Sequence, residues 1–161
     1  MLKKLLLVFA FIYFSEAIAF SKNLLDSIPA LNREIIAFVD SRMKKKVGRG
    51  ECWDLAAEAL NASNAKWNGK FQFGRKLNHD EEILPGDIIQ FEGVKIKFQE
   101  GNARITQVLK HHTGIVYTMK GKQQFDMANQ NTAEHGKKVA LTFIDLEQVI
   151  SGKYFIYRPE R

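Results

Sequence analysis

The spacing of apolar residues along the chain changes from helical to extended at about residue 83. Apolar positions between residues 33 and 46 recur at the period of an α-helix, which predicts an amphipathic helix over this range. Gly48 and Gly50 follow it. A second helix is predicted over 52–61, because its apolar residues fall on one side at the same period.

From residue 83 onward, short segments alternate apolar and polar residues, as half-buried strands do. The predicted strands lie in LPGDIIQFEG, VKIKFQ, HHTGIVYTMKGKQQFDMANQN (two strands with a turn at 120–122), KKVALTFI and KYFIYRP, with a short helix over 145–151. Helices first and strands afterwards predict an α+β domain in which N-terminal helices pack on a mostly antiparallel sheet.

The first 19 residues have the pattern of a secretory signal peptide. Two lysines precede an apolar run, and Ala17-Ile18-Ala19 matches an A-x-A cleavage site. The run is shorter than the about 20 residues that a membrane span needs. The sequence therefore predicts a signal peptide over 1–19, a lead-in over 20–32 and a catalytic domain over 33–161. It also predicts a secreted or periplasmic location, with no transmembrane segment after cleavage.

Charge and composition limit the classes of partner and ligand that we expect for this protein. The net charge of +6 favours anionic surroundings such as cell-wall polymers. The one run of basic residues in the chain, at 44–46, is typical of a solvated helix end, so we expect no nucleic-acid binding. The histidines lack a ligand spacing such as H-E-x-x-H, so we expect no metal and no cofactor. We expect a monomer.

Cys52 is the single cysteine of the chain, so no internal disulfide is possible. It falls in the first turn of the second predicted helix. Unpaired backbone N–H groups and the positive end of the helix dipole stabilise a thiolate at such a position. The preceding glycines leave room for a substrate to approach. These features favour a reactive thiol, with a buried hydrophobic role as the alternative.

A thiolate nucleophile needs a base and a group that orients the base. The candidate bases are His79, His111, His112 and His135. Adjacent strand residues point to opposite faces, so only one of His111 and His112 can face Cys52. The apolar pattern of the strand does not choose between them.

The candidates for the group that orients the histidine lie in the predicted strand QQFDMANQN. Alternation places Phe125, Met127, Asn129 and Asn131 on one face of this strand, with Asp126 on the other. We expect the Phe125–Met127 face to point at the core and at the helix that carries Cys52. Asn129 or Asn131 is then the orienting candidate, while the alternative is that both asparagines begin a turn.

The succession of GxGxCWDLA, LPGDIIQF, HTGIVY, NQN and YRP resembles the CHAP family of cysteine, histidine-dependent amidohydrolases and peptidases. CHAP domains are similar to NlpC-type cell-wall peptidases within the papain-like fold. The resemblance covers nearly all of 33–161. It implies a nucleophile at Cys52, a base at His112, and the family's Glu-x-Asn pair at Asn129 and Asn131. Asn129 stands where an acid is common, and an amide stabilises a charged imidazole less than a carboxylate does.

The leading hypothesis is therefore an exported cysteine hydrolase that cleaves an amide bond, with peptidoglycan peptides as the expected substrate. The alternatives are a catalytically silent module that binds cell wall or a protein partner, and an acyltransferase or thioesterase on the same fold.

Overall fold

The computed structural model describes residues 28–161, and it contains two α-helices and one six-stranded sheet in this range. The signal peptide predicted over 1–19 lies outside the described residues. The elements are α2 (Ala30–Arg42), α3 (Cys52–Ala62), β1 (Arg75–Lys76), β2 (Ile88–Glu100), β3 (Ala103–Met119), β4 (Gln124–Asn129), β5 (Ala140–Asp145), the 3-10 helix η1 (Leu146–Gln148) and β6 (Val149–Arg158). Helices followed by an antiparallel sheet confirm the predicted α+β class.

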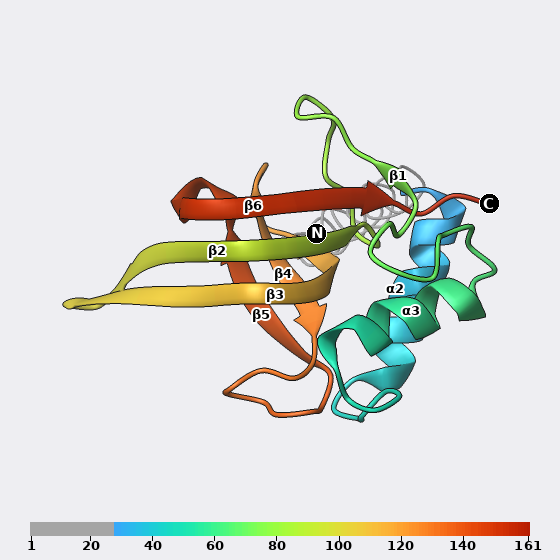
Figure 1. The fold of residues 1–161 in the computed structure, drawn as a ribbon, viewed down its shortest axis with the longest axis horizontal. Helices are drawn as coiled ribbons and strands as arrows, with labels where there is room; N and C mark the ends of the chain where they lie inside the picture. The colour runs from blue at the N-terminus through green and yellow to red at the C-terminus, as the bar shows by residue number, and fades with distance from the viewer. Residues whose placement is uncertain (1–27) are drawn as a thin grey trace, which may run out of the picture.

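The strands follow the order β1-β6-β2-β3-β4-β5, and neighbouring strands pair antiparallel. The two helices lie together at one end of the sheet, and the long β2–β3 hairpin extends away from them at the other end (Figure 1). Among the described residues, no helix is long and apolar enough to cross a membrane.

Both faces of the sheet are buried, each by its own hydrophobic cluster. On one face, Leu55 and Ala56 of α3 pack with Ile88, Ile115 and Ala128 of the central strands. The opposite cluster consists mainly of strand residues, which include Ile89, Phe91, Val116, Phe125, Met127 and Ile144, together with Leu146 of η1 and Ile83 of the loop before β2. Burial of apolar surface on two faces stabilises the sheet without a disulfide.

This arrangement corrects one sequence-based expectation. Phe125 and Met127 belong to the cluster on the far side of the sheet, and Ala128 is the β4 residue that packs in the cluster of α3. The alternation along β4 was predicted correctly. The Phe125–Met127 face is buried in a hydrophobic core, as expected. The expectation that it meets the helix of Cys52 was wrong, because a strand that is buried on both sides carries no sign of which face a helix covers.

Element boundaries also differ from the predicted ones. The first helix spans Ala30–Arg42 instead of 33–46. Pro29 is its N-cap residue, and the Pro29 carbonyl accepts the first helical hydrogen bond, from the N–H of Arg33 at 3.1 Å. The predicted short helix over 145–151 is limited to the single turn of η1, after which β6 begins at Val149. Residues 88–100 form one continuous strand where two segments were expected.

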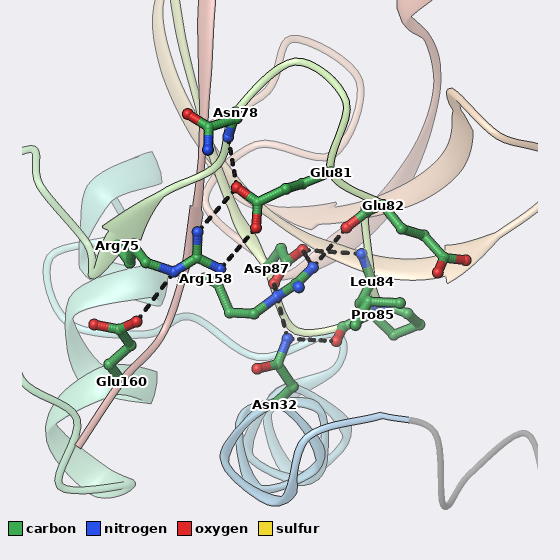
Figure 2. A network of polar contacts seen from close by, with 10 residues as sticks. All are labelled: Asn32, Arg75, Asn78, Glu81, Glu82, Leu84, Pro85, Asp87, Arg158 and Glu160. Carbon is green, nitrogen blue, oxygen red and sulfur yellow. Dashed lines mark hydrogen bonds and ion pairs between the residues drawn. The ribbon is translucent and has the colours of Figure 1, made fainter.

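A buried polar network joins α2 to the sheet (Figure 2). The carboxylate of Asp87 is fully buried and accepts hydrogen bonds from Arg158 Nη2 at 2.8 Å and Nε at 3.1 Å. Asn32 Nδ2 donates to Asp87 Oδ1 at 2.9 Å, and the N–H of Leu84 donates to Oδ2 at 2.9 Å. The first turn of α2 is thereby fixed to the start of β2 and the end of β6.

An outer ion pair borders this network. Arg75 binds Glu81 at 2.9 Å and Glu160 at 3.2 Å, and hydrogen bonds from Arg75 and the Asn78 N–H lower the pKa of Glu81 to about 2 (Figure 2). Glu81 is solvent-accessible, so water screens this pair. We therefore attribute the attachment of α2 to the sheet to the hydrogen bonds of Asp87, and not to the ion pair of Glu81.

Gly114→Ala should destabilise the fold. A Cβ atom at Gly114 would lie 2.3 Å from the sulfur of Met127, inside the second hydrophobic cluster. Overpacking of this kind costs about 1–3 kcal/mol in the free energy of unfolding, which urea denaturation would measure. Gly121→Ala is the matched control, because its Cβ would approach only the flexible Gln124 side chain at 3.1 Å. Equal stability of the two variants would contradict the close approach at Gly114.

Candidate active site

Cys52 is the first residue of α3, and the loop before it is held by the buried carboxylate of Asp54. Asp54 Oδ2 accepts from the N–H groups of Arg49 at 2.8 Å and Glu51 at 3.3 Å, and Oδ1 accepts from the Arg49 guanidinium at 2.7 Å. Burial alone would raise the pKa of Asp54, but these hydrogen bonds outweigh it and hold the pKa below its ordinary value. The loop therefore presents Cys52 in a defined position at the helix start.

Two glycines shape the same loop. Gly48 and Gly50 have φ angles of 55° and 88°, in the left-handed region that favours glycine. A Cβ at Gly50 would lie 2.7 Å from Cβ of Lys137, so the loop also passes close to the segment that follows β4. The glycines thus allow the left-handed backbone conformation of the loop and its close packing against Lys137.

The end of β4 is bound directly to this loop through Gln130, which is fully buried. Gln130 Oε1 accepts from the Val47 N–H at 3.1 Å, and Nε2 donates to the carbonyls of Val47 at 3.0 Å and Glu51 at 2.8 Å. Asn131 Nδ2 donates to Glu51 Oε2 at 2.7 Å. The residue next to Cys52 is therefore fixed to the chain that leaves β4.

His112 and Asn129 form a buried pair on neighbouring strands, with His112 Nε2 and Asn129 Oδ1 3.1 Å apart. The Nδ2 group of Asn129 donates to the Met127 carbonyl at 3.1 Å, to Thr142 Oγ1 at 3.0 Å and to the Ala140 carbonyl at 3.4 Å. With Nδ2 directed at these acceptors, Oδ1 is the amide atom that faces the ring. His112 Nε2 must then donate, which leaves Nδ1 as the basic nitrogen of the neutral ring.

Burial lowers the pKa of His112 below its ordinary value of 6.5; the hydrogen bond to Asn129 opposes this shift, and the nearby charge of His111 adds to it. The ring is therefore neutral at neutral pH, which is the state that a general base needs. Because the unfolded chain binds this proton more readily, protonation favours unfolding as the pH falls below about 6.5.

The other candidate residues have different surroundings. His111 Nδ1 lies 2.8 Å from Glu92 Oε2, and the ring meets Phe71 edge-on at 4.6 Å between centroids. His135 lies beside Glu134 at 3.5 Å, and Asp126 pairs with Lys120 at 3.0 Å. His79 lines a pocket formed by residues 76–83, 122–123 and 154–156.

Gln130 and Asn131 bind Glu51, so the start of α3 lies at the end of β4. The His112–Asn129 pair lies nearby on the Met127 face of the sheet, opposite the cluster in which α3 packs. The β3–β4 pairing begins at Ile115 and Ala128, and His112 lies just outside it, where Gln130 turns toward Glu51. Within residues 28–161, the half-buried Cys52 is a free thiol without a hydrogen bond to the His112 ring. Asn131 contacts Glu51, so its predicted support of His112 stays a prediction.

Sequence reasoning missed Gln130 and the Glu51–Asp54 pair. The latter had a readable signal, because an acceptor at the helix cap and an acid three residues later form a capping box. Gln130 had no comparable signal, since its partners lie 79 and 83 residues away.

The His112 ring should titrate below pH 6.5 in NMR spectra of the folded chain. Asn129→Ala should lower the midpoint further, because it removes the hydrogen bond that raises the pKa. Asn129→Asp should raise it, because a carboxylate stabilises the charged ring. A midpoint that is the same in all three proteins would exclude the Asn129 contact.

Comparisons with known proteins identify the family of this chain. Residues 20–161 match the family model described as the AIM3/BBC1 cysteine proteinase-fold domain. One curated relative is the altered inheritance of mitochondria protein 3 of Debaryomyces hansenii, which is 28% identical over 148 residues. The match covers 78% of this chain and 15% of that protein, so the chain spans only a small part of its relative.

Two solved structures are similar to the chain. The crystal structure of Ly7917 aligns with 17% identity and a TM-score of 0.46, over 78% of this chain and 62% of that one. The crystal structure of Ly7917 with the hydrolyzing product of MDP aligns with 15% identity and a TM-score of 0.47, over 80% and 62%.

These matches correct the predicted location. The family is named for AIM3 and BBC1, and the relative from Debaryomyces hansenii is a yeast protein named for the inheritance of mitochondria. The prediction of a secreted or periplasmic location was therefore wrong. The family model supports the papain-like cysteine proteinase fold, whereas the finer assignment to the CHAP or NlpC type remains a resemblance.

Proposed function

The chain belongs to the AIM3/BBC1 cysteine proteinase-fold family, and we propose on that premise that it is a cysteine-dependent hydrolase of amide bonds. The observation that carries the proposal is the buried contact between His112 Nε2 and Asn129 Oδ1, because it leaves Nδ1 of the neutral ring available as a base. The fixed position of Cys52 at the start of α3 supplies the nucleophile.

In the proposed reaction, His112 Nδ1 takes the proton of the Cys52 thiol, and the thiolate attacks the amide carbonyl. Nδ1 then delivers the proton to the leaving amine, so the C–N bond breaks and an acyl-enzyme remains. Water hydrolyses the thioester with the same histidine as base. Asn129 keeps the ring oriented, and the N–H of Cys52 at the helix start is a suitable donor to the oxyanion.

The substrate class that we propose is an amide bond of the peptide type, on the basis of the family's cysteine proteinase fold. Peptidoglycan was expected because of export, positive charge and the resemblance to the CHAP family. The correction of the location removes the first of these supports, so peptidoglycan is not part of the proposal.

A second candidate function, a silent module that binds a protein partner, is favoured by two observations. Within the described part of the chain, the Cys52 thiol has no hydrogen bond to His112, and an amide stands where a carboxylate would stabilise the charged ring. A protein that keeps the fold and has lost the chemistry would show the same two features.

Iodoacetamide alkylation of Cys52 at pH 7.5 distinguishes the two functions. For the hydrolase, we expect alkylation faster than in the urea-denatured chain, slowed by His112→Ala, together with cleavage of a peptide library that Cys52→Ala lacks. Mass spectrometry would follow both. Slow alkylation that His112→Ala leaves unchanged, with no cleavage, would favour the silent module.

A further inference from the structure

A pocket of about 510 Å³ lies against the His112–Asn129 pair. Its lining comes from β3, from the end of β4 and the turn that follows it, and from one residue of β5, and it includes Leu109, Met127, Ala133 and Thr142. Cys52 is not among the lining residues, whereas both members of the pair are.

The turn that forms one wall is tightly closed. Thr132 and Gly136 exchange backbone hydrogen bonds of 3.1 and 2.9 Å, and Thr132 Oγ1 accepts from the His135 N–H at 3.0 Å. Asn131 binds Glu51 at the base of this turn. This wall of the pocket is therefore bound to the residue that precedes Cys52.

The floor of the pocket is apolar at Met127 and Leu109, beside the polar groups of His112, Asn129 and Thr142, which bond to one another. Met127 is fully buried, Leu109 is 8% exposed, and Thr142 Oγ1 is engaged by Asn129. The carboxylate of Glu134 is 80% exposed, so it lies at the rim and not inside. A floor of this kind accepts an aliphatic or aromatic side chain and desolvates a charged one at a cost.

We propose that this pocket is the subsite for the leaving group, and that it takes an apolar side chain on the amine side of the scissile bond. The inference rests on the proposed hydrolase function. During the reaction, the acyl carbon is bonded to Cys52, while the leaving nitrogen receives its proton from His112. A pocket that borders His112 and excludes Cys52 therefore receives the part of the substrate that departs with that nitrogen.

The pocket can be tested without catalysis, in Cys52→Ala protein labelled with ¹³C in the methionine methyl groups. The chain has four methionines, of which Met127 lines the pocket, while Met43 and Met119 do not. The probes are Leu-Gly amide and Asp-Gly amide, both with the free amine of a leaving group. We expect Leu-Gly amide to shift the Met127 methyl signal, identified from Met127→Leu, at a concentration at least tenfold below that needed by Asp-Gly amide.

Ala133→Trp, made in the same protein, supplies the second measurement. Ala133 is an exposed residue of the turn, and a tryptophan there would fill the pocket without entering the hydrophobic clusters. It should abolish the Met127 shift, while Ala133→Ser keeps it and unchanged Met43 and Met119 signals show that the fold is intact. No Met127 shift with either peptide, equal shifts with both, or a shift that survives Ala133→Trp would each overturn the subsite.

The failure of this inference is distinguishable from failure of the hydrolase proposal. Fast, His112-dependent alkylation of Cys52 without a selective Met127 shift would contradict the proposed subsite. It would still support the proposed hydrolase function. A selective shift with a slow, His112-independent thiol would overturn the leaving-group assignment, because no leaving group would exist.

Discussion

His112→Ala should lower the rate of peptide cleavage by about 10²–10⁴-fold, the range expected when a general base is removed. The reason is the tautomer that Asn129 enforces: with Nε2 donating to Oδ1, Nδ1 is the nitrogen that takes the thiol proton. Cleavage of a fluorogenic peptide would measure the loss, and circular dichroism would show that the fold survives.

His111→Ala is the matched control, because the two histidines are adjacent and face opposite sides of β3. His111 is bound to Glu92 and Phe71, so its removal should leave most of the activity. If His111→Ala is the inactive variant and His112→Ala retains cleavage, the assignment of the base is wrong.

Asp87→Ala should reduce the free energy of unfolding by about 3–5 kcal/mol, as the removal of one partner from a buried ion pair does. Asp87 is fully buried and the Arg158 side chain is 18% exposed, so the variant leaves a shielded guanidinium without its anion. It also removes an acceptor from Asn32, whose Oδ1 already has no hydrogen-bond partner among the described residues. Urea denaturation would measure the change.

Glu81→Ala provides the comparison for Asp87→Ala. Glu81 also pairs with an arginine, but water screens it, so its loss should change stability far less. If the two variants lost the same free energy of unfolding, the outer ion pair would contribute to the attachment of α2 as much as Asp87 does.

Local patterns in the sequence were sufficient for the elements nearest the site. The glycines before Cys52 and the apolar period after it predicted α3 closely, because helix starts depend on neighbouring residues. The alternation in QQFDMANQN correctly placed Phe125, Met127 and Asn129 on one face of β4, and the structure adds the contact between Asn129 and His112.

Contacts between residues that are far apart in the chain could not be predicted from the sequence. The face of β4 that meets α3 was assigned wrongly, since apolar residues on both sides of a central strand carry no sign of which helix covers them. The link from Gln130 to Val47 and Glu51 depends on tertiary packing. The predicted location failed for a different reason: a short apolar N-terminal segment is a compositional signal, and family membership overruled it.

The bridge made by Gln130 also has a consequence for the order in which the protein forms. During synthesis, Val47 leaves the ribosome 83 residues before the side chain that will fix it, and Glu51 leaves 79 residues before. Contacts with such separation form only after a large loss of chain entropy. The helix that carries Cys52 is therefore released well before the residues that will anchor its start, and the site is completed only when the strand preceding Gln130 joins the sheet. A ribosome-bound chain that ends before Asn129 has the thiol and His112 but neither Asn129 nor Gln130.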